Sequence, residues 1–170
     1  MKARKILFYV FLTLAVAVNV LIIVESCIGG EGSAAQSFSF SESIANLIEH
    51  IFPGAIKDHA AFHSAIRKIV GHFLLFGLSG IFTTLTFVMN DYLMNKFKWK
   101  NIIFILSIGL VIALVSELIQ YFVPSRNANF IDVLTDFLGA LIGIMICLMV
   151  YGIVRLIQKT NENKEQIEEK

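Results

Sequence analysis

The sequence contains little charge for its length. Of its 170 residues only 16% are charged, whereas 56% are hydrophobic and the mean hydropathy is +0.75. A small soluble domain has no interior large enough to bury that many apolar residues. The composition therefore excludes a soluble enzyme, a disordered chain and a nucleic-acid-binding protein. Fourteen basic against thirteen acidic residues also create no overall field that attracts a polyanion.

Cysteine is equally scarce, with only Cys27 and Cys147 in the chain. Cys27 follows one apolar run and Cys147 lies inside another, so the sequence predicts no internal disulfide between them. The two residues give no information about the redox compartment. The positions of the few charged residues must therefore carry the functional signal.

Four apolar runs are long enough for membrane helices, which need about 20 mostly apolar residues. The sequence predicts an all-α fold, an integral membrane bundle of four transmembrane helices with a short amphipathic outer helix. The four spans are Ile6–Val24, Ile69–Met89, Ile102–Val123 and Val133–Val154. The chain then divides into a first transmembrane anchor (1–24), an extracytoplasmic loop (25–68), a core of three transmembrane helices (69–154) and a charged cytoplasmic tail (155–170).

The distribution of lysine and arginine predicts the orientation. With the N-terminus inside, ten of these residues lie on the inner side and only four, Lys57, Arg67, Lys68 and Arg126, lie outside. Both termini are therefore expected in the cytoplasm, with Trp99 as an anchor at the inner interface. The stretch Val24–Cys27 resembles a lipoprotein cleavage box, but the preceding run is longer than a signal h-region of about 7–15 residues. Glu25 also occupies a position that is normally small or apolar, so a retained anchor is expected.

The long segment between the first two spans contains turn, cap and helix signals. Its glycine- and serine-rich stretch 29–35 is typical of a flexible linker. Ser39 and Glu42 then fit a capping box, and apolar residues at helical spacing predict an amphipathic helix that ends at Pro53. This helix is expected either to lie on the outer membrane face or to cap the bundle. Asp58 is expected to cap a helix that continues into the second span, and the tail 158–170 shows no sign of a fold.

Polar residues recur on one face of the third and fourth spans. An ionisable side chain near the membrane centre costs about 2.5–3.5 kcal/mol on insertion scales, so it needs a partner or a wet cavity. The third span carries a small and polar stripe of Gly109, Ala113, Ser116, Glu117 and Gln120. The fourth carries Asp132, Asp136, Gly139, Gly143 and Cys147, in which the two glycines fit the GxxxG pattern for close helix approach.

These groups meet at one depth just below the predicted outer interface. The sequence predicts a polar pocket there, with eight candidate ligand-binding residues: Arg67, Lys68, His72, Glu117, Gln120, Arg126, Asp132 and Asp136. The alternative is that these residues only lock the bundle, Glu117 pairing with Arg126 and Asp132 with Arg67 or Lys68. The spacing of His59 and His63 would allow zinc binding, but without further ligands it is typical of an interfacial pair. No metal and no cofactor is expected.

Three motifs resemble those of the VanZ-like family of small bacterial membrane proteins. They are Arg67–Phe73 (RKIVGHF), Glu117–Arg126 (ELIQYFVPSR) and Asp132–Ala140 (DVLTDFLGA), in that order on the expected helices. The resemblance covers about residues 37 to 150 and implies an integral protein of the bacterial plasma membrane and cell envelope. The family's namesake is associated with lowered susceptibility to teicoplanin, a glycopeptide with a lipid tail. The family usually has asparagine where this chain has Asp136, and no established reaction comes with the resemblance.

Two functional hypotheses follow. The first is a pocket that binds an anionic lipid headgroup or a lipid-linked cell-wall precursor, without catalysis, and so alters access of lipoglycopeptide antibiotics to the envelope. The second is a membrane enzyme acting on a lipid phosphate or pyrophosphate, with His72 as acid, base or nucleophile. A transporter ranks third because four spans give too little wall without a homo-oligomer. The expected partners are membrane lipids and no nucleic acid.

Overall fold

The chain folds into helices joined by short connections. The computed structural model describes residues 2–93, 99–124, 126 and 128–168, and within those ranges it contains no strand. The elements are α1 (Lys2–Cys27), α2 (Gly30–Ile51), α3 (His59–Arg67), η1 (Lys68–Leu74), α4 (Leu75–Leu93), α5 (Trp99–Phe122) and α6 (Phe130–Glu168). The α1, α4, α5 and α6 segments are long and apolar enough to cross a membrane. The predicted fold class is therefore confirmed.

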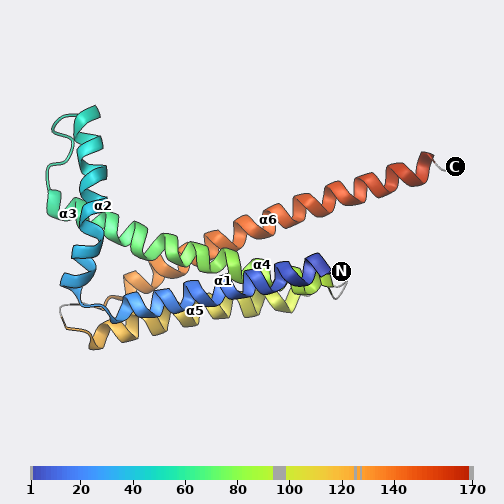
Figure 1. Cartoon of the computed structure of the whole chain (residues 1–170), viewed down its shortest axis with the longest axis horizontal. Helices are drawn as coiled ribbons and strands as arrows, with labels where there is room; N and C mark the ends of the chain where they lie inside the picture. Colours follow the sequence, from blue (N-terminus) through green and yellow to red (C-terminus); the bar gives the residue numbers. More distant parts are fainter. Residues whose placement is uncertain (1, 94–98, 125, 127, 169–170) are drawn as a thin grey trace.

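The four long helices form an antiparallel bundle. Figure 1 shows the two termini at one end of this bundle and α2 and α3 at the opposite end. Helix α4 lies at the centre, with its largest contacts to α6 and α1, while α5 packs on α6 and α1. The outward faces keep large apolar side chains exposed, such as Phe104, Tyr121 and Met149. In a membrane those side chains contact lipid, which explains how so small a protein accommodates its apolar excess.

The contact between α4 and α6 is made by glycines. A Cβ on Gly139 would lie 2.4 Å from the carbonyl oxygen of Phe73, and one on Gly143 would lie 2.1 Å from that of Gly77. From the other side, a Cβ on Gly80 would lie 2.2 Å from the carbonyl oxygen of Ala140. The two backbones are therefore in direct contact, as expected where the attraction comes from close packing and not from the hydrophobic effect. The GxxxG interpretation of Gly139 and Gly143 is thus confirmed.

Polar side chains attach α1 to the rest of the bundle. Ser79 of α4 donates a 2.7 Å hydrogen bond to Oδ1 of Asn19. Nearer the C-terminal end of α1, the hydroxyls of Ser26 and Ser116 lie 2.8 Å apart and join α1 to α5. Ser26, Ser79 and Ser116 are all buried. Hydrogen bonds of this kind hold helices together where lipid offers no alternative partner.

Helix α2 begins earlier than the sequence predicts. The stretch 29–35 is not a linker, because the helix starts at Gly30 and Ser33 already donates to the carbonyl of Gly29. Ser39 is not an N-cap either, since the Ser43 hydroxyl bonds its carbonyl inside the helix. Tertiary packing accounts for the difference: a face of small residues, including Ser41 and Ala45, is buried where α2 packs chiefly on α3.

The predicted outer helix is thus long, and it lies across the direction of the bundle (Figure 1). It leaves several large apolar side chains exposed, Phe38, Phe40, Leu47 and Ile51. An exposed apolar face on a helix that packs mainly on α3 favours the first of the two expected roles, a helix lying on the membrane surface.

The entry into the second span follows the expectation at its start. Asp58 is the N-cap of α3 and accepts a hydrogen bond from the backbone N–H of Ala61. The turn before it is held by Glu49, whose carboxylate accepts from the N–H groups of Gly54 and Ile56 and whose pKa these bonds lower. The following segment, η1, is wound more widely, as a π-type helix, which the sequence does not predict. Such segments occur often at functional sites.

The chain also ends differently from the prediction. The tail 158–170 was expected to be without a fold, yet α6 continues to Glu168. Glutamine, lysine and glutamate are good helix formers, so extending an existing helix costs little. Trp99 begins α5, and its predicted anchoring role concerns a side chain outside the described part of the structure.

Candidate functional site

The end of the bundle that carries α2 and α3 contains a polar depression of about 380 Å³. It is lined by Gly30, Glu31, Ala34, Arg67, Lys68, His72, Gln120, Arg126 and Asp132. A smaller recess of about 30 Å³ lies next to it and shares Arg67, His72 and Arg126. Residues from α2, α3, η1, α5 and α6 and from the α5–α6 connection thus meet at one place. We call the larger space the polar depression and the smaller one the recess.

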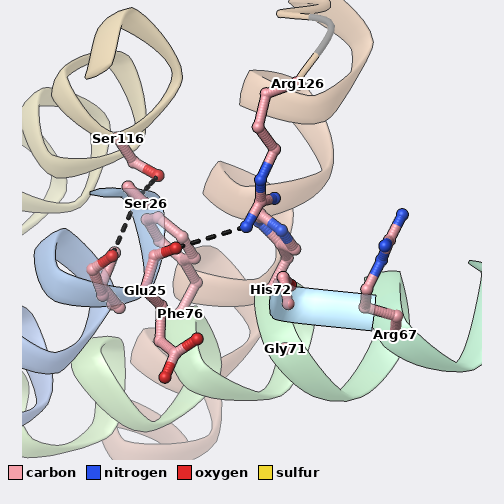
Figure 2. A pocket seen from close by; sticks show the side chains of 10 residues that line it. Glu25, Ser26, Arg67, Gly71, His72, Phe76, Ser116 and Arg126 are labelled. Atoms are coloured by element: carbon pink, nitrogen blue, oxygen red, sulfur yellow. Dashed lines mark hydrogen bonds between the residues drawn. The ribbon is translucent and has the colours of Figure 1, made fainter. Parts of the chain in front are cut away.

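Arg126 is held by neutral acceptors. Its Nε donates to the carbonyl of Ile28 at 3.1 Å, and one Nη donates to the carbonyl of Glu25 at 3.3 Å. The other Nη donates to Oε1 of Gln120 at 3.2 Å. Figure 2 shows the Glu25 carboxylate pointing away from the guanidinium. Burial, and next the positive charge of Arg67, lower the pKa of Arg126 from its usual value.

The η1 segment contributes two side chains that are paired with α6. Lys68 Nζ lies 2.7 Å from Oδ1 of Asp132. One helical turn further on, His72 Nδ1 lies 3.3 Å from Oδ1 and 3.4 Å from Oδ2 of Asp136, with hydrogen-bond geometry only to Oδ2. Asp136 is fully buried. The two pairs place a cation-bearing face of η1 directly against the acidic start of α6.

Glu117 lies beneath the depression and supports the α5–α6 connection. Its Oε1 accepts a short hydrogen bond from the backbone N–H of Asn129. Asn129 in turn caps α6, because its side-chain Oδ1 accepts from the backbone N–H of Ile131. The other oxygen, Oε2, is buried without a hydrogen-bond partner among the described residues. Glu117 is therefore a buried acceptor that fixes the start of α6, and its position is deeper than that of Arg126.

The structure brings the predicted residues together in two layers. Six of the eight line the depression: Arg67, Lys68, His72, Gln120, Arg126 and Asp132. Glu117 and Asp136 lie behind them and are buried. Of the pairs that would lock the bundle, Asp132 with Lys68 is present. The pairing of Glu117 with Arg126 is wrong, because Arg126 reaches the end of α1 and Gln120 while Glu117 turns to Asn129.

The N-terminal part of the site was missed by the sequence analysis. The recess is also lined by Ile22, Glu25, Ser26 and Ser33, and the carbonyls of Ile28 and Gly30 accept from Arg126 and Arg67. A sequence signal exists for part of it, since Asn19 and Ser26 recur on one face of an otherwise apolar run. The backbone carbonyls have no sequence signal, because any residue could supply them.

The histidine pair on α3 has a structural role. His63 Nδ1 lies 2.7 Å from the Ser41 hydroxyl, and Nε2 lies 3.3 Å from Oε2 of Glu42. These contacts attach α3 to α2. Within the described ranges no group of three histidine, cysteine, aspartate or glutamate side chains is arranged to hold a metal ion.

The opposite end of the bundle also buries a carboxylate. Asp91 is 2% exposed, and its Oδ1 accepts a 2.7 Å hydrogen bond from the side-chain amide of Asn101. This contact joins α4 to α5. Asp91 is not among the eight residues that the sequence predicts for the polar pocket.

Comparison with known proteins identifies a family. The family model described as VanZ/LLP1 matches residues 8–152, which is most of the chain. The match includes all eight candidate site residues; it begins within the first span and ends within the fourth. Neither a curated protein nor a solved structure matches the chain.

Proposed function

The chain belongs to the VanZ/LLP1 family, and from that premise we propose that it binds the anionic headgroup of a membrane lipid or of a lipid-linked cell-wall precursor in the polar depression. With the lipid bound there, the protein alters the envelope so that lipoglycopeptides such as teicoplanin reach their target less well. The proposed setting is the bacterial plasma membrane, and the protein acts by binding, without turnover.

One observation carries the proposal: two arginines face the same depression without a carboxylate partner. Within the described ranges the ion pairs involve His63, Lys68 and His72, and neither Arg67 nor Arg126 takes part in one. Arg126 contacts only neutral oxygens, and Arg67 reaches the carbonyl of Gly30 at 3.5 Å. Two partly buried guanidinium groups that repel each other are stabilised by an anion placed between them. Arginine is well suited to this because it binds phosphate through paired, charge-assisted hydrogen bonds.

The remaining residues supply selectivity under this proposal. Lys68 and His72 flank the arginines, and their carboxylate partners, Asp132 and Asp136, hold them in place. Gln120 is buried and orients the Arg126 guanidinium, because its Oε1 accepts from Arg126 while its amide nitrogen donates to the Ser116 hydroxyl at 3.4 Å. Together with Glu31, such groups suit the hydroxyls of a sugar or glycerol next to the phosphate.

The orientation belongs to the proposal as well. Both termini lie at the end of the bundle away from the depression (Figure 1), and ten of fourteen basic residues belong to that end or its connections. The positive-inside rule then places both termini in the cytoplasm and the depression toward the outer leaflet. Cys27, which is exposed, should react with a membrane-impermeant thiol reagent applied to intact cells, and protection of Cys27 there would reverse the orientation.

A second function has one observation in its favour. His72 lines the depression while its Nδ1 faces the buried carboxylate of Asp136. A histidine oriented by a carboxylate is the usual form of a general acid or base. The alternative is therefore a membrane enzyme that acts on a lipid phosphate or pyrophosphate. Release of inorganic phosphate from a lipid phosphate by the purified protein, lost in His72→Gln, would select this alternative over binding alone.

The binding proposal is tested with Arg67→Gln and a matched control. Arg67 makes one long hydrogen bond within the protein, so its removal should leave the fold intact. Arg155→Gln makes the same chemical change on α6, away from the depression. We expect the affinity of the detergent-solubilised protein for glycerol 3-phosphate to fall about tenfold or more in Arg67→Gln only. Equal affinity in the two variants, or no binding by the wild type, would contradict the proposal.

A further inference from the structure

An apolar groove runs beside the polar depression. It has a volume of about 330 Å³ and lies between α1, α2 and the continuous segment of α3, η1 and α4. Its apolar walls are Leu21, Phe40, Ile66, Val70 and Leu75. Phe40 belongs to the exposed apolar face of α2, so the groove opens where that helix borders the bundle.

The groove and the recess under Arg126 share a boundary. Glu25, Ser33, Arg67 and Gly71 line both spaces, and Arg67 also lines the depression. Figure 2 shows Arg67 and His72 on either side of Gly71 along the same helical segment. Gly71 borders open space, because a Cβ added there would meet no atom within 4 Å. Because Gly71 lines both the recess and the apolar groove, its lack of a side chain leaves the passage between these two spaces open.

We propose that this groove holds the apolar chain of the same lipid whose phosphate is bound by Arg67 and Arg126. The inference rests on the proposed function and makes the ligand class narrower: a long-chain lipid phosphate in which the chain leaves close to the phosphate. A membrane lipid, and not a protein segment, is the occupant because the apolar walls end directly at the guanidinium of Arg67. Apolar walls next to a cationic side chain match an amphiphile, which joins an apolar chain to a charged group.

The proposal gives each side chain a distinct task. Arg67 lies at the junction, so it contacts the phosphate at the point where the chain begins. The serine and glutamate at the boundary, Ser33 and Glu25, would contact the polar linkage between chain and phosphate. Leu21, Val70 and Leu75 would contact the chain itself, which enters sideways from the membrane past Phe40.

The test uses Gly71→Leu with Gly152→Leu as its control. Both glycines have free space around the position of a Cβ, and both changes favour a helix. Only Gly71 lies on the passage. The probes are palmitoyl lysophosphatidate, which has a chain, and glycerol 3-phosphate, which has none, each titrated into the detergent-solubilised protein and measured by native mass spectrometry.

We expect Gly71→Leu to weaken binding of palmitoyl lysophosphatidate about tenfold or more while glycerol 3-phosphate binds as in the wild type and Gly152→Leu changes neither. Unchanged lysophosphatidate binding in Gly71→Leu would overturn the proposal that the groove holds the lipid chain and would leave the proposal of headgroup binding intact. Wild-type protein that binds neither probe would overturn both proposals.

A second pair of variants covers the case in which Gly71→Leu does not fold. Phe40 and Phe52 are both exposed, at 52% and 65%, but only Phe40 lines the groove. Phe40→Gln should weaken lysophosphatidate binding and spare glycerol 3-phosphate, whereas Phe52→Gln should affect neither. Equal lysophosphatidate binding by these two variants would also overturn the proposal that the groove holds the lipid chain.

Discussion

The middle of the α4–α6 contact and the polar end of the bundle have opposite character. In its middle, Gly77, Gly80, Gly139 and Gly143 bring the two backbones into direct contact. At the end that carries α2 and α3, η1 and α6 are separated by longer side chains, which pair as Lys68 with Asp132 and His72 with Asp136. The first region leaves no space, and the second leaves a depression of about 380 Å³.

The difference explains how a four-helix bundle of this size keeps a polar cavity in a membrane. The exposed ion pair of Lys68 and Asp132 contributes little to stability, and the buried charges must be desolvated at a cost. The glycine contact supplies close packing that does not depend on those charges. The polar end is therefore free to keep Arg67 and Arg126 unpaired, because the helices are held together elsewhere.

The largest effect is expected from a side chain inserted into the glycine contact. In Gly143→Leu the new Cβ would lie 2.1 Å from the carbonyl oxygen of Gly77, and backbone has no room to move aside. Overpacking of this kind should lower the free energy of unfolding by about 3 kcal/mol and reduce the folded yield. Thermal unfolding in detergent measures it, and Gly152→Leu, with open space at its Cβ, should match the wild type. Equal stability of the two variants would show that the close contact is not what holds the bundle.

A smaller loss is expected at the buried acceptor of the polar end. Glu117→Ala leaves the N–H of Asn129 without its partner, which should cost about 1–2 kcal/mol and loosen the start of α6. Glu117→Gln keeps a carbonyl oxygen and should recover most of that loss. Unfolding in detergent compares the two, together with hydrogen exchange at the start of α6. If glutamine were as damaging as alanine, the charge of Glu117 and not its hydrogen bond would be the important property.

The smallest effect is expected at the residue that departs from the family pattern. Asp136→Asn keeps an oxygen that can face His72 Nδ1, so both stability and binding of glycerol 3-phosphate should stay near the wild-type values. Asp132→Asn is the comparison, since it removes the charge that faces Lys68 at 2.7 Å. A clear loss of binding in well-folded Asp136→Asn would show that the negative charge is required.

Particular residues show how far sequence reasoning reached. The spans and the polar stripe on Glu117 and Gln120 were predictable because a membrane tolerates ionisable groups only where they face protein. The helical start of α2 was not, since the stretch 29–35 has the composition of a linker, yet the helix begins at Gly30. The wrong pairing of Glu117 with Arg126 has a similar cause: proximity along the chain does not indicate which backbone carbonyls a long side chain reaches.

The sequence by itself determined that this is a four-span membrane bundle, with its candidate site residues near one end and its glycines on the contact face of the fourth span. Those features follow from length, hydropathy and helical periodicity, which are local properties of the chain. Only the tertiary structure decided that Arg126 is held by the end of α1, that Lys68 and His72 are paired with α6, and that Gly71 lines both the recess and the apolar groove. Those features depend on distances between residues far apart in the sequence, which packing alone sets.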